Sequence, residues 1–424
     1  MSGENISFMR TSGGVPVLID KIFGSESAGY MVGVRTGSRD EDESVMGISH
    51  LLEHVVFRET ETRSSYQMAK EMEGAGGEMN AFTAKEMTAF YAVTISETKN
   101  TAKEMVADIV ANPLINGNDV ELEKKIVLQE LSMIENEPES YIHDLFSSRI
   151  WRGHKLAQDE GGTAEIVKNL GSEELRAYYE ERYGIPNIAV FAAGNVGEED
   201  TVSWAEEMFD GLSGKKEIKR HGPNTPKAGY SFTENKSEHY HVAMGFPAYD
   251  SDHPDRVPLT LLSAVIGSGT SSRLFQEVRE KRALVYSVYN SVEQHSDAGA
   301  LCTYMSSTEE NVIRGMETAA AVYRKIRDGG LEKGELDRTK NLIKGSLVRS
   351  MESTERRLYR LGKEFLLSGK HQSLGDRLKA ISNVTEEDVM RVASDIIKGS
   401  TLNVAVLGRE NKDIRNFSGS VLDL

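Results

Sequence analysis

Cysteine is nearly absent from this sequence of 424 residues, in which Cys302 is the only one. One cysteine excludes an intramolecular disulfide framework and suits a reducing compartment. No apolar run is long enough to span a bilayer, and the first twenty residues lack the basic and then apolar pattern of a secretion signal. We therefore expect a cytoplasmic protein that does not enter a membrane.

Positive charge is also scarce, since 50 Lys and Arg stand against 66 Asp and Glu, a net charge of −16. Phosphate binding needs a basic face, so this balance disfavours nucleic acid as a partner. Most of the acidic residues are expected to form a solvated surface. If acids gathered in a cavity, they would favour a basic ligand.

The sequence divides into two halves of similar length. Residues 211–230 are rich in Lys, Gly and Pro and have no apolar period, which is typical of an exposed linker. We expect an N-terminal domain over 1–212, a linker over 213–229 and a C-terminal domain over 230–424. The segments 120–131 and 334–347 resemble each other, which indicates that the two domains are homologous.

Strand-like and helix-like segments are mixed within each half. Residues 79–95 alternate polar and apolar side chains, which predicts a β-hairpin, and residues 98–112 have the period of an amphipathic helix. We expect the α+β class, with two homologous domains, each a largely antiparallel sheet covered by helices on one face.

The motif HLLEH at 50–54 is the strongest chemical signal. Residues 45–57 predict a mostly buried helix, on which His50 and His54 lie one turn apart on the same face, with Glu53 beside them. Burying such groups without partners costs about 1–3 kcal/mol each, and a divalent cation removes that cost. Zinc suits two histidines and a carboxylate. The alternative is an ordinary histidine pair, because His-x-x-Glu-His also arises by chance.

A third ligand is available in the segment ELEKKIVLQE at 121–130. Glu123 and Glu130 are seven residues apart, two helical turns, and therefore share a face. One could bind the metal while the other orients a histidine. The alternative is a solvated helix face on which both acids lie beside Lys124 and Lys125.

The two motifs together resemble the M16 zinc metallopeptidases (inverzincins), which include insulin-degrading enzyme, pitrilysin and the mitochondrial processing peptidase. The resemblance to a small-subunit member is nearly full-length and implies the LuxS/MPP-like metallohydrolase fold. It implies one zinc ion per chain, held by His50, His54 and Glu130. Glu53 would be the general base, and Glu123 matches the second acidic position of the family.

Two further elements are similar to the family's substrate-binding parts. GGEMNAFTAKEMTAFY resembles its edge strand, so Asn80, Ala81 and Phe82 are expected to receive the substrate backbone. REKRALVY resembles its Arg and Tyr element, so Arg279 and Tyr286 are expected to contact substrate and to stabilise the oxyanion. The second half has SSRLFQE where the first has its histidines, and is not expected to bind zinc.

The sequence therefore predicts a zinc-dependent endopeptidase that cleaves unstructured peptides inside a closed chamber. Because one chain has only two such domains, a homodimer with shared active sites is expected, or a heterodimer with a related chain. The alternative function is a non-catalytic peptide-binding or scaffold subunit of a heteromeric processing peptidase.

Two weaker signals point elsewhere. Gly267 and Gly269 follow an apolar run, like half of a dinucleotide-binding loop, but a third glycine is missing. His239 and His241 alternate along an expected strand and share a face, but no third metal ligand lies near them in the sequence. A helix-start turn and a solvated strand are the preferred interpretations.

Overall fold

The computed structural model describes residues 5–212, 217–417 and 424. The chain forms two compact units, each of which draws on both halves of the sequence. The first unit comprises Met1–Leu131, Gln158–Arg220 and Val348–Asp376, and the second comprises Ser132–Ala157, His221–Leu347 and Arg377–Leu424.

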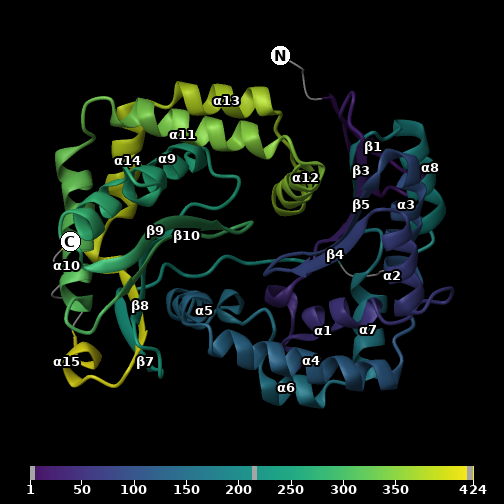
Figure 1. Cartoon of the computed structure of the whole chain (residues 1–424), viewed down its shortest axis with the longest axis horizontal. Coiled ribbons are helices and arrows are strands. Elements are labelled where there is room, and N and C mark those ends of the chain that lie inside the picture. The colour runs from purple at the N-terminus through teal and green to yellow at the C-terminus, as the bar shows by residue number, and fades with distance from the viewer. Residues whose placement is uncertain (1–4, 213–216, 418–423) are drawn as a thin grey trace. The chain divides into compact units, whose positions relative to one another are not determined.

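The first unit is built on a sheet with the strand order β1-β2-β6-β3-β5-β4. Figure 1 labels β1, β3, β5 and β4 of this sheet. All neighbours are antiparallel except β2 and β6. The strands are β1 (Asn5–Arg10), β2 (Pro16–Lys21), β3 (Ser27–Val34), β4 (Glu78–Thr83), β5 (Thr88–Ile95) and β6 (Ile188–Gly194). The predicted hairpin over 79–95 is thus β4 and β5, and β4 lies at the edge of the sheet.

Helices cover both faces of this sheet. On one face, α3 packs on β3 and β5, and Tyr30 and Val32 point into that core. On the other face, Met31 and Phe191 meet α12. The helices of this unit are α1 (Ile48–Val56), α2 (Ser65–Gly74), α3 (Lys99–Ala111), α6 (Ala164–Asn169), α7 (Ser172–Arg182), α8 (Glu198–Phe209) and α12 (Thr354–Ser368), with most of α4 (Gly117–Glu135).

The α+β class is confirmed, but the expectation that helices cover only one face is wrong. Alternating side chains of β3 are apolar in both directions, so both faces of the sheet need a cover. Gly29 and Gly33 make room for it, since a Cβ on either would lie within 2.6 Å of Leu358 or Leu366 of α12. The buried Asp20 of β2 also pairs with an arginine of this helix.

The second unit repeats this plan with the strand order β7-β11-β8-β10-β9, antiparallel except for β7 and β11. Helices α9, α10 and α14 pack on one face, and α5 packs on β8 and β11 from the other. The strands are β7 (Gly229–Glu234), β8 (Tyr240–Ala248), β9 (Val285–Gln294), β10 (Gly299–Ser307) and β11 (Asn403–Gly408). The helices are α5 (Pro138–Ile150), α9 (Arg256–Gly267), α10 (Val312–Gly329), α11 (Glu335–Ser350), α13 (Leu374–Asn383), α14 (Glu386–Ile396) and α15 (Lys412–Arg415), of which α11 and α13 each begin or end in the first unit.

The expected boundaries at 213–229 stay a prediction, and 213–216 lie outside the described residues. The contacts add what the sequence did not indicate: the segment after α4 belongs to the second unit, and the segment from the end of α11 to the start of α13 belongs to the first. Within the part of the chain that the structure describes, no helix is long and apolar enough to cross a bilayer.

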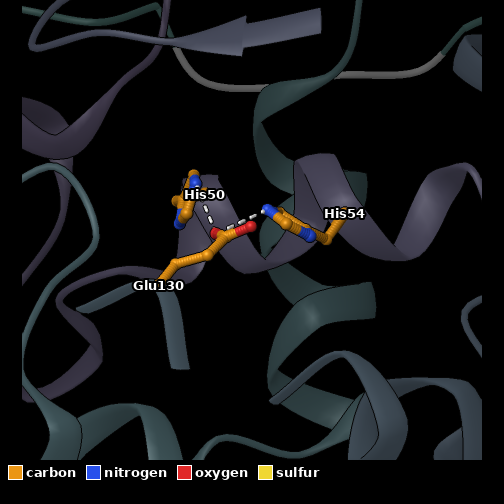
Figure 2. A group of neighbouring side chains, drawn as sticks. All are labelled: His50, His54 and Glu130. Atoms are coloured by element: carbon orange, nitrogen blue, oxygen red, sulfur yellow. Dashed lines mark ion pairs between the residues drawn. The ribbon is translucent and has the colours of Figure 1, made fainter. Parts of the chain in front are cut away.

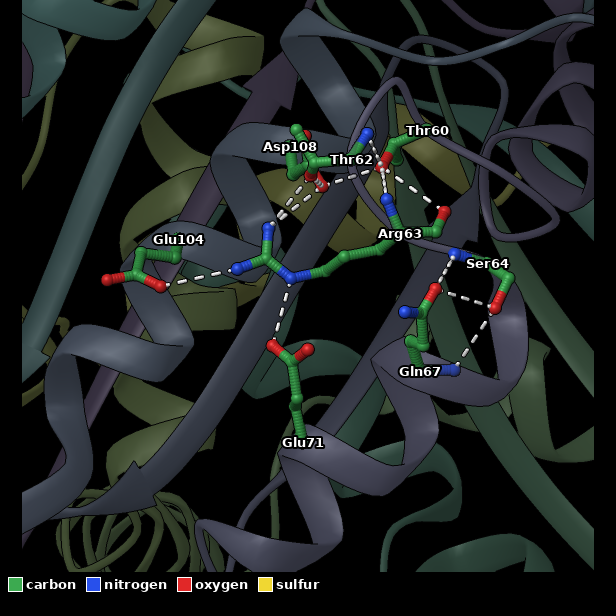
Figure 3. Close-up of polar contacts among 8 residues, drawn as sticks. All are labelled: Thr60, Thr62, Arg63, Ser64, Gln67, Glu71, Glu104 and Asp108. Atoms are coloured by element: carbon green, nitrogen blue, oxygen red, sulfur yellow. Dashed lines mark hydrogen bonds and ion pairs between the residues drawn. The ribbon is translucent and has the colours of Figure 1, made fainter.

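A polar cluster fastens the loop that follows α1 (Figure 3). One oxygen of the buried Asp108 in α3 accepts hydrogen bonds from the hydroxyls of Thr60 and Thr62 and from Nη1 of Arg63, at 2.6, 2.7 and 3.0 Å. Burial alone would raise the pKa of Asp108, but these three donors outweigh it and lower the pKa below its usual value. The cluster therefore holds the loop with a charged carboxylate.

Candidate metal centre

Helix α1 carries the HLLEH motif and begins just after Gly47, slightly later than the predicted residue 45. Gly47 has a φ of 90°, and a Cβ there would lie 2.4 Å from the carbonyl oxygen of Gly161, so glycine is required. The buried carboxylate of Glu41 accepts hydrogen bonds from the backbone N–H groups of Gly47 and Ser49, at 2.7 and 2.8 Å. These bonds satisfy donors at the start of the helix.

His50 and His54 lie one turn apart on the half-buried face of α1, while Leu51, Leu52 and Val55 fill the core. The two ring centroids are 4.8 Å apart. Burial lowers the pKa of His50 to about 4, and the neighbouring His54 acts in the same direction. His50 is therefore neutral at pH 7 and offers a lone pair, as metal binding requires.

Helix α4 brings two carboxylates to these histidines. Figure 2 shows Glu130 between the rings, with its Oε2 3.3 Å from Nε2 of His54 and 3.9 Å from Nε2 of His50. Glu123, two turns earlier, is buried, and its Oε2 lies 3.1 Å from Nδ1 of His54. All four residues predicted from the two motifs for metal binding and its support thus lie together.

The donor set fits a zinc ion. Ligand atoms of His50, His54 and Glu130 all lie within 4.8 Å of one another, the only such group in the described part of the chain. Because Glu123 occupies Nδ1 of His54, the other nitrogen of that ring is left to face Glu130. Nδ1 of His50 is buried and has no hydrogen-bond partner among the described residues.

Glu53 lies on the same helix between the two histidines. Its Oε2 accepts a hydrogen bond of 2.5 Å from the hydroxyl of Thr83 on β4. Burial raises the pKa of Glu53 above its usual value, while the bond from Thr83 and the proximity of His54 act against that rise. A carboxylate with a raised pKa is suited to accept and return a proton.

The predicted strand residues Asn80, Ala81 and Phe82 lie on β4, which packs beside α1. Asn80 is exposed, Ala81 packs against the core, and the ring of Phe82 contacts that of Tyr359 of α12 at a tilt of 51°, with ring centroids 5.2 Å apart. Because β4 has a neighbour on one side only, its other edge can accept main-chain hydrogen bonds from a peptide.

Arg279 and Tyr286 belong to the second unit. Arg279 is exposed at the end of a short π-helix, Phe275–Glu280, with its guanidinium 4.8 Å from the centre of the Phe275 ring. Tyr286 is on the edge strand β9 and is 77% exposed. Between them Ala283 has a φ of 49°, the only positive φ at a non-glycine residue in the described ranges. Such strain is frequent at functional sites.

The weaker signals have structural explanations. Arg273 of SSRLFQE forms a buried ion pair with Glu335 at 2.5 Å, and the second unit holds no metal-binding group among its described residues. The apolar run before Gly267 is helix α9 and not a strand, so the dinucleotide loop is excluded. His241 bonds the hydroxyl of Tyr304 through Nδ1 at 2.9 Å.

Sequence reasoning missed three residues around the site. Arg58 lies one turn after His54, and its Nη1 is 3.5 Å from Oε1 of Glu123. Thr83 bonds Glu53, and Glu41 anchors the start of α1. The helical spacing of Arg58 from His54 was a usable signal, whereas the other two contacts depend on how distant segments pack.

Comparison with known proteins places the chain in a family. Residues 17–164 match the family Insulinase (Peptidase family M16), and residues 169–343 match the Peptidase M16 inactive domain. An uncharacterized zinc protease of Mycobacterium bovis is 34% identical over 405 residues, covering 93% of this chain and 91% of the relative. Another from Bacillus subtilis is 32% identical, covering 90% and 93%. The chain therefore belongs to peptidase family M16.

Solved structures share the fold. The crystal structure of a peptidase M16 inactive domain from Pseudomonas fluorescens has a TM-score of 0.88 at 19% identity, covering 96% of this chain and 98% of that one. A protease from Helicobacter pylori also has a TM-score of 0.88, at 20% identity, covering 95% and 99%. At these identities the likeness establishes the fold alone.

Proposed function

We propose that the protein is a zinc-dependent endopeptidase. The observation that carries this proposal is the convergence of His50, His54 and Glu130 from two helices, with Glu123 behind one histidine and Glu53 beside both. Relatives named zinc proteases, covering nine-tenths of the chain, support it. We propose one ion per chain, held by the two imidazoles and the Glu130 carboxylate. A bound zinc would supply Lewis acidity at the scissile carbonyl.

Glu53 is the proposed general base. Its carboxylate takes a proton from the attacking water and passes it to the leaving nitrogen of the peptide. The bond from Thr83 fixes the orientation of the carboxylate, and burial favours its protonated form between the two transfers. Glu123 has a positioning role, since it holds Nδ1 of His54, whereas Glu130 lies near the other ring nitrogen, Nε2.

The proposed substrates are unstructured peptides. An extended peptide can add to the free edge of β4, where main-chain hydrogen bonds recognise any sequence. β4 contacts α1, and its Thr83 bonds Glu53, so a strand added to its free edge would run near Glu53 and the histidines. A folded substrate cannot form such a strand, which accounts for the proposed class.

A homodimer with shared active sites completes the proposal. Arg279 and Tyr286 are both exposed, and the strained turn at Ala283 separates them. In a closed chamber made by two copies, these side chains would contact the peptide held at the metal centre of the partner, with Tyr286 stabilising the oxyanion. A related chain could take the place of the second copy. The proposed location is the cytoplasm, which the low cysteine content favours.

Digestion of a peptide library by the purified chain tests the activity. Cleavage products detected by mass spectrometry are expected with zinc and should disappear with a chelator and return with added zinc. The zinc content of the purified chain distinguishes the peptidase from the alternative, a non-catalytic scaffold subunit, which would lack bound zinc. A chain that binds no zinc and cleaves no peptide of the library contradicts the proposal.

A further inference from the structure

A cavity of about 350 Å³ lies in the second unit, where the end of α5 and the turn after it meet the chain that leads into β7. It is lined by residues 149–154 and 222–228. Although the whole chain is acidic, the lining includes Arg149, Arg152 and Lys227, and none of its described residues is Asp or Glu. The cavity is therefore a local concentration of positive charge.

Arg149 is held in place by its surroundings. The Cβ that Gly229 lacks would lie 1.1 Å from Nη2 of Arg149, so the guanidinium rests on the backbone of this glycine. Its Nε is buried and has no hydrogen-bond partner among the described residues. Burial lowers the pKa of Arg149, and the charge of Arg152 lowers it further. Asp297 packs against Gly222 but does not line the cavity.

Trp151 forms part of the cavity wall. It lines the cavity and is 2% exposed, and its Nε1 has no hydrogen-bond partner in the described part of the chain. His154 is different, because its Nε2 bonds the carbonyl of His221 at 2.8 Å and its Nδ1 accepts from the N–H of Leu156 at 3.2 Å. His154 therefore lines the cavity with both ring nitrogens already hydrogen-bonded, and the arginines and the lysine are the groups available to a ligand.

We propose that this cavity binds the phosphate group of a small molecule, with Arg149, Arg152 and Lys227 facing its oxygens and Trp151 forming part of its wall. Two adjacent guanidinium groups match the charge of about −2 that a phosphate monoester carries near pH 7. The volume lies in the range of small-molecule sites. This site is separate from the proposed peptidase chemistry, since it uses none of the residues of the metal centre.

Fluorescence of Trp151 can report the binding directly. The chain has two tryptophans, so Trp204→Phe leaves Trp151 as the single reporter. Added inorganic phosphate should change the Trp151 emission until the site is saturated. Phosphate should also raise the melting temperature of the unmodified protein. We expect R152Q to raise the Kd for phosphate about tenfold or more, because it removes a charged hydrogen bond. R149Q/R152Q should abolish the response.

Three controls make the outcome decisive. Arg314→Gln removes a charge from the exposed surface of α10 and should leave phosphate binding unchanged. Glu53→Gln should also leave phosphate binding unchanged. The phosphate test therefore does not depend on whether the peptidase proposal is correct. A response that is linear, that sodium chloride reproduces at equal ionic strength, or that persists in R149Q/R152Q overturns the inference. Equal saturation by succinate overturns the assignment to phosphate.

Discussion

The carboxylate of Glu53 on α1 accepts a hydrogen bond from the hydroxyl of Thr83 on β4. The contact links the helix that carries the histidines to the strand whose free edge is available to a peptide. A substrate added to that edge would therefore lie against a strand that is hydrogen-bonded to the proposed base. Thr83 would fix the carboxylate relative to a peptide backbone bound there, as the proposed catalysis requires.

Replacing Glu53 by Gln should abolish most of the activity while leaving the metal bound. The substitution keeps the size of the side chain and all three proposed ligands, but it removes the proton acceptor, so turnover should fall by about 10²–10⁴-fold. Peptide cleavage and zinc content measured on the same sample check this. Glu165→Gln, at an exposed position of α6, is the matched control. Full activity of the Glu53 variant would refute the mechanism.

The two acids of α4 should differ in their effect on zinc. Glu130→Gln removes an anionic ligand and should release the ion, whereas Glu123→Gln should weaken zinc affinity by about 10–100-fold, because Glu123 only orients His54. Competition with a chromophoric chelator measures both affinities. Glu121→Gln, on the same helix and 64% exposed, should bind zinc normally. The reverse order for the first two variants would mean that their roles are exchanged.

Shared active sites predict complementation between two inactive variants. Glu53→Gln protein lacks the base, and the double variant Arg279→Ala/Tyr286→Ala lacks the substrate element. Mixed under conditions that exchange subunits, some heterodimers would contain one intact site and recover peptide cleavage. Mass spectrometry of the intact complexes verifies the exchange. Mixtures that stay inactive after proven exchange, or full activity of a wild-type monomer, would exclude the shared-site arrangement.

Asp108→Asn should destabilise the first unit by about 1–3 kcal/mol at neutral pH, because the amide cannot satisfy all three donors of the cluster in Figure 3. Folding lowers the pKa of Asp108. The charged carboxylate therefore contributes its full stabilisation above the ordinary pKa of about 4. That stabilisation is lost as the pH falls through the lower pKa that Asp108 has in the folded protein. Urea unfolding of both proteins from pH 7 to pH 3 tests this. Glu104→Gln, whose side chain is 63% exposed, should change stability little. If the unfolding free energies of the wild type and Asp108→Asn differed by the same amount at every pH in this range, Asp108 would not act as a charged carboxylate.

Arg357→Ala should be strongly destabilising. Asp20 is completely buried in β2, with Nη1 of Arg357 3.0 Å from its carboxylate and Arg360 more distant at 3.9 Å. Removing the nearer partner leaves a buried charge poorly compensated and should lower the unfolding free energy by about 3 kcal/mol. Arg356→Ala, the exposed neighbour on the same helix, is the control for denaturant unfolding. Equal midpoints for the two variants would show that the pair contributes nothing.

The sequence predicted the local parts of this molecule well. The helical spacing of His50 and His54, and of Glu123 and Glu130, depends only on residues within two turns, and the family resemblance related the two pairs to each other. The cover that α12 provides over β3 was not predictable in this way, because it joins segments more than 300 residues apart. The same holds for Thr83 and Glu41, whose contacts depend on tertiary packing.

The exchange of segments between the units has a consequence for synthesis on the ribosome. The first sheet is complete once β6 has been made at Gly194, but the helix that covers its second face ends at Ser368. Until that helix emerges, Met31, Phe191 and their apolar neighbours lack the leucines of α12 that bury them in the folded chain. A fragment that stops at residue 220 would lack α12, so this apolar face would stay exposed and the fragment would aggregate through it. The N-terminal half therefore carries the proposed zinc ligands, but burial of the second face of its sheet depends on α12 from the C-terminal half.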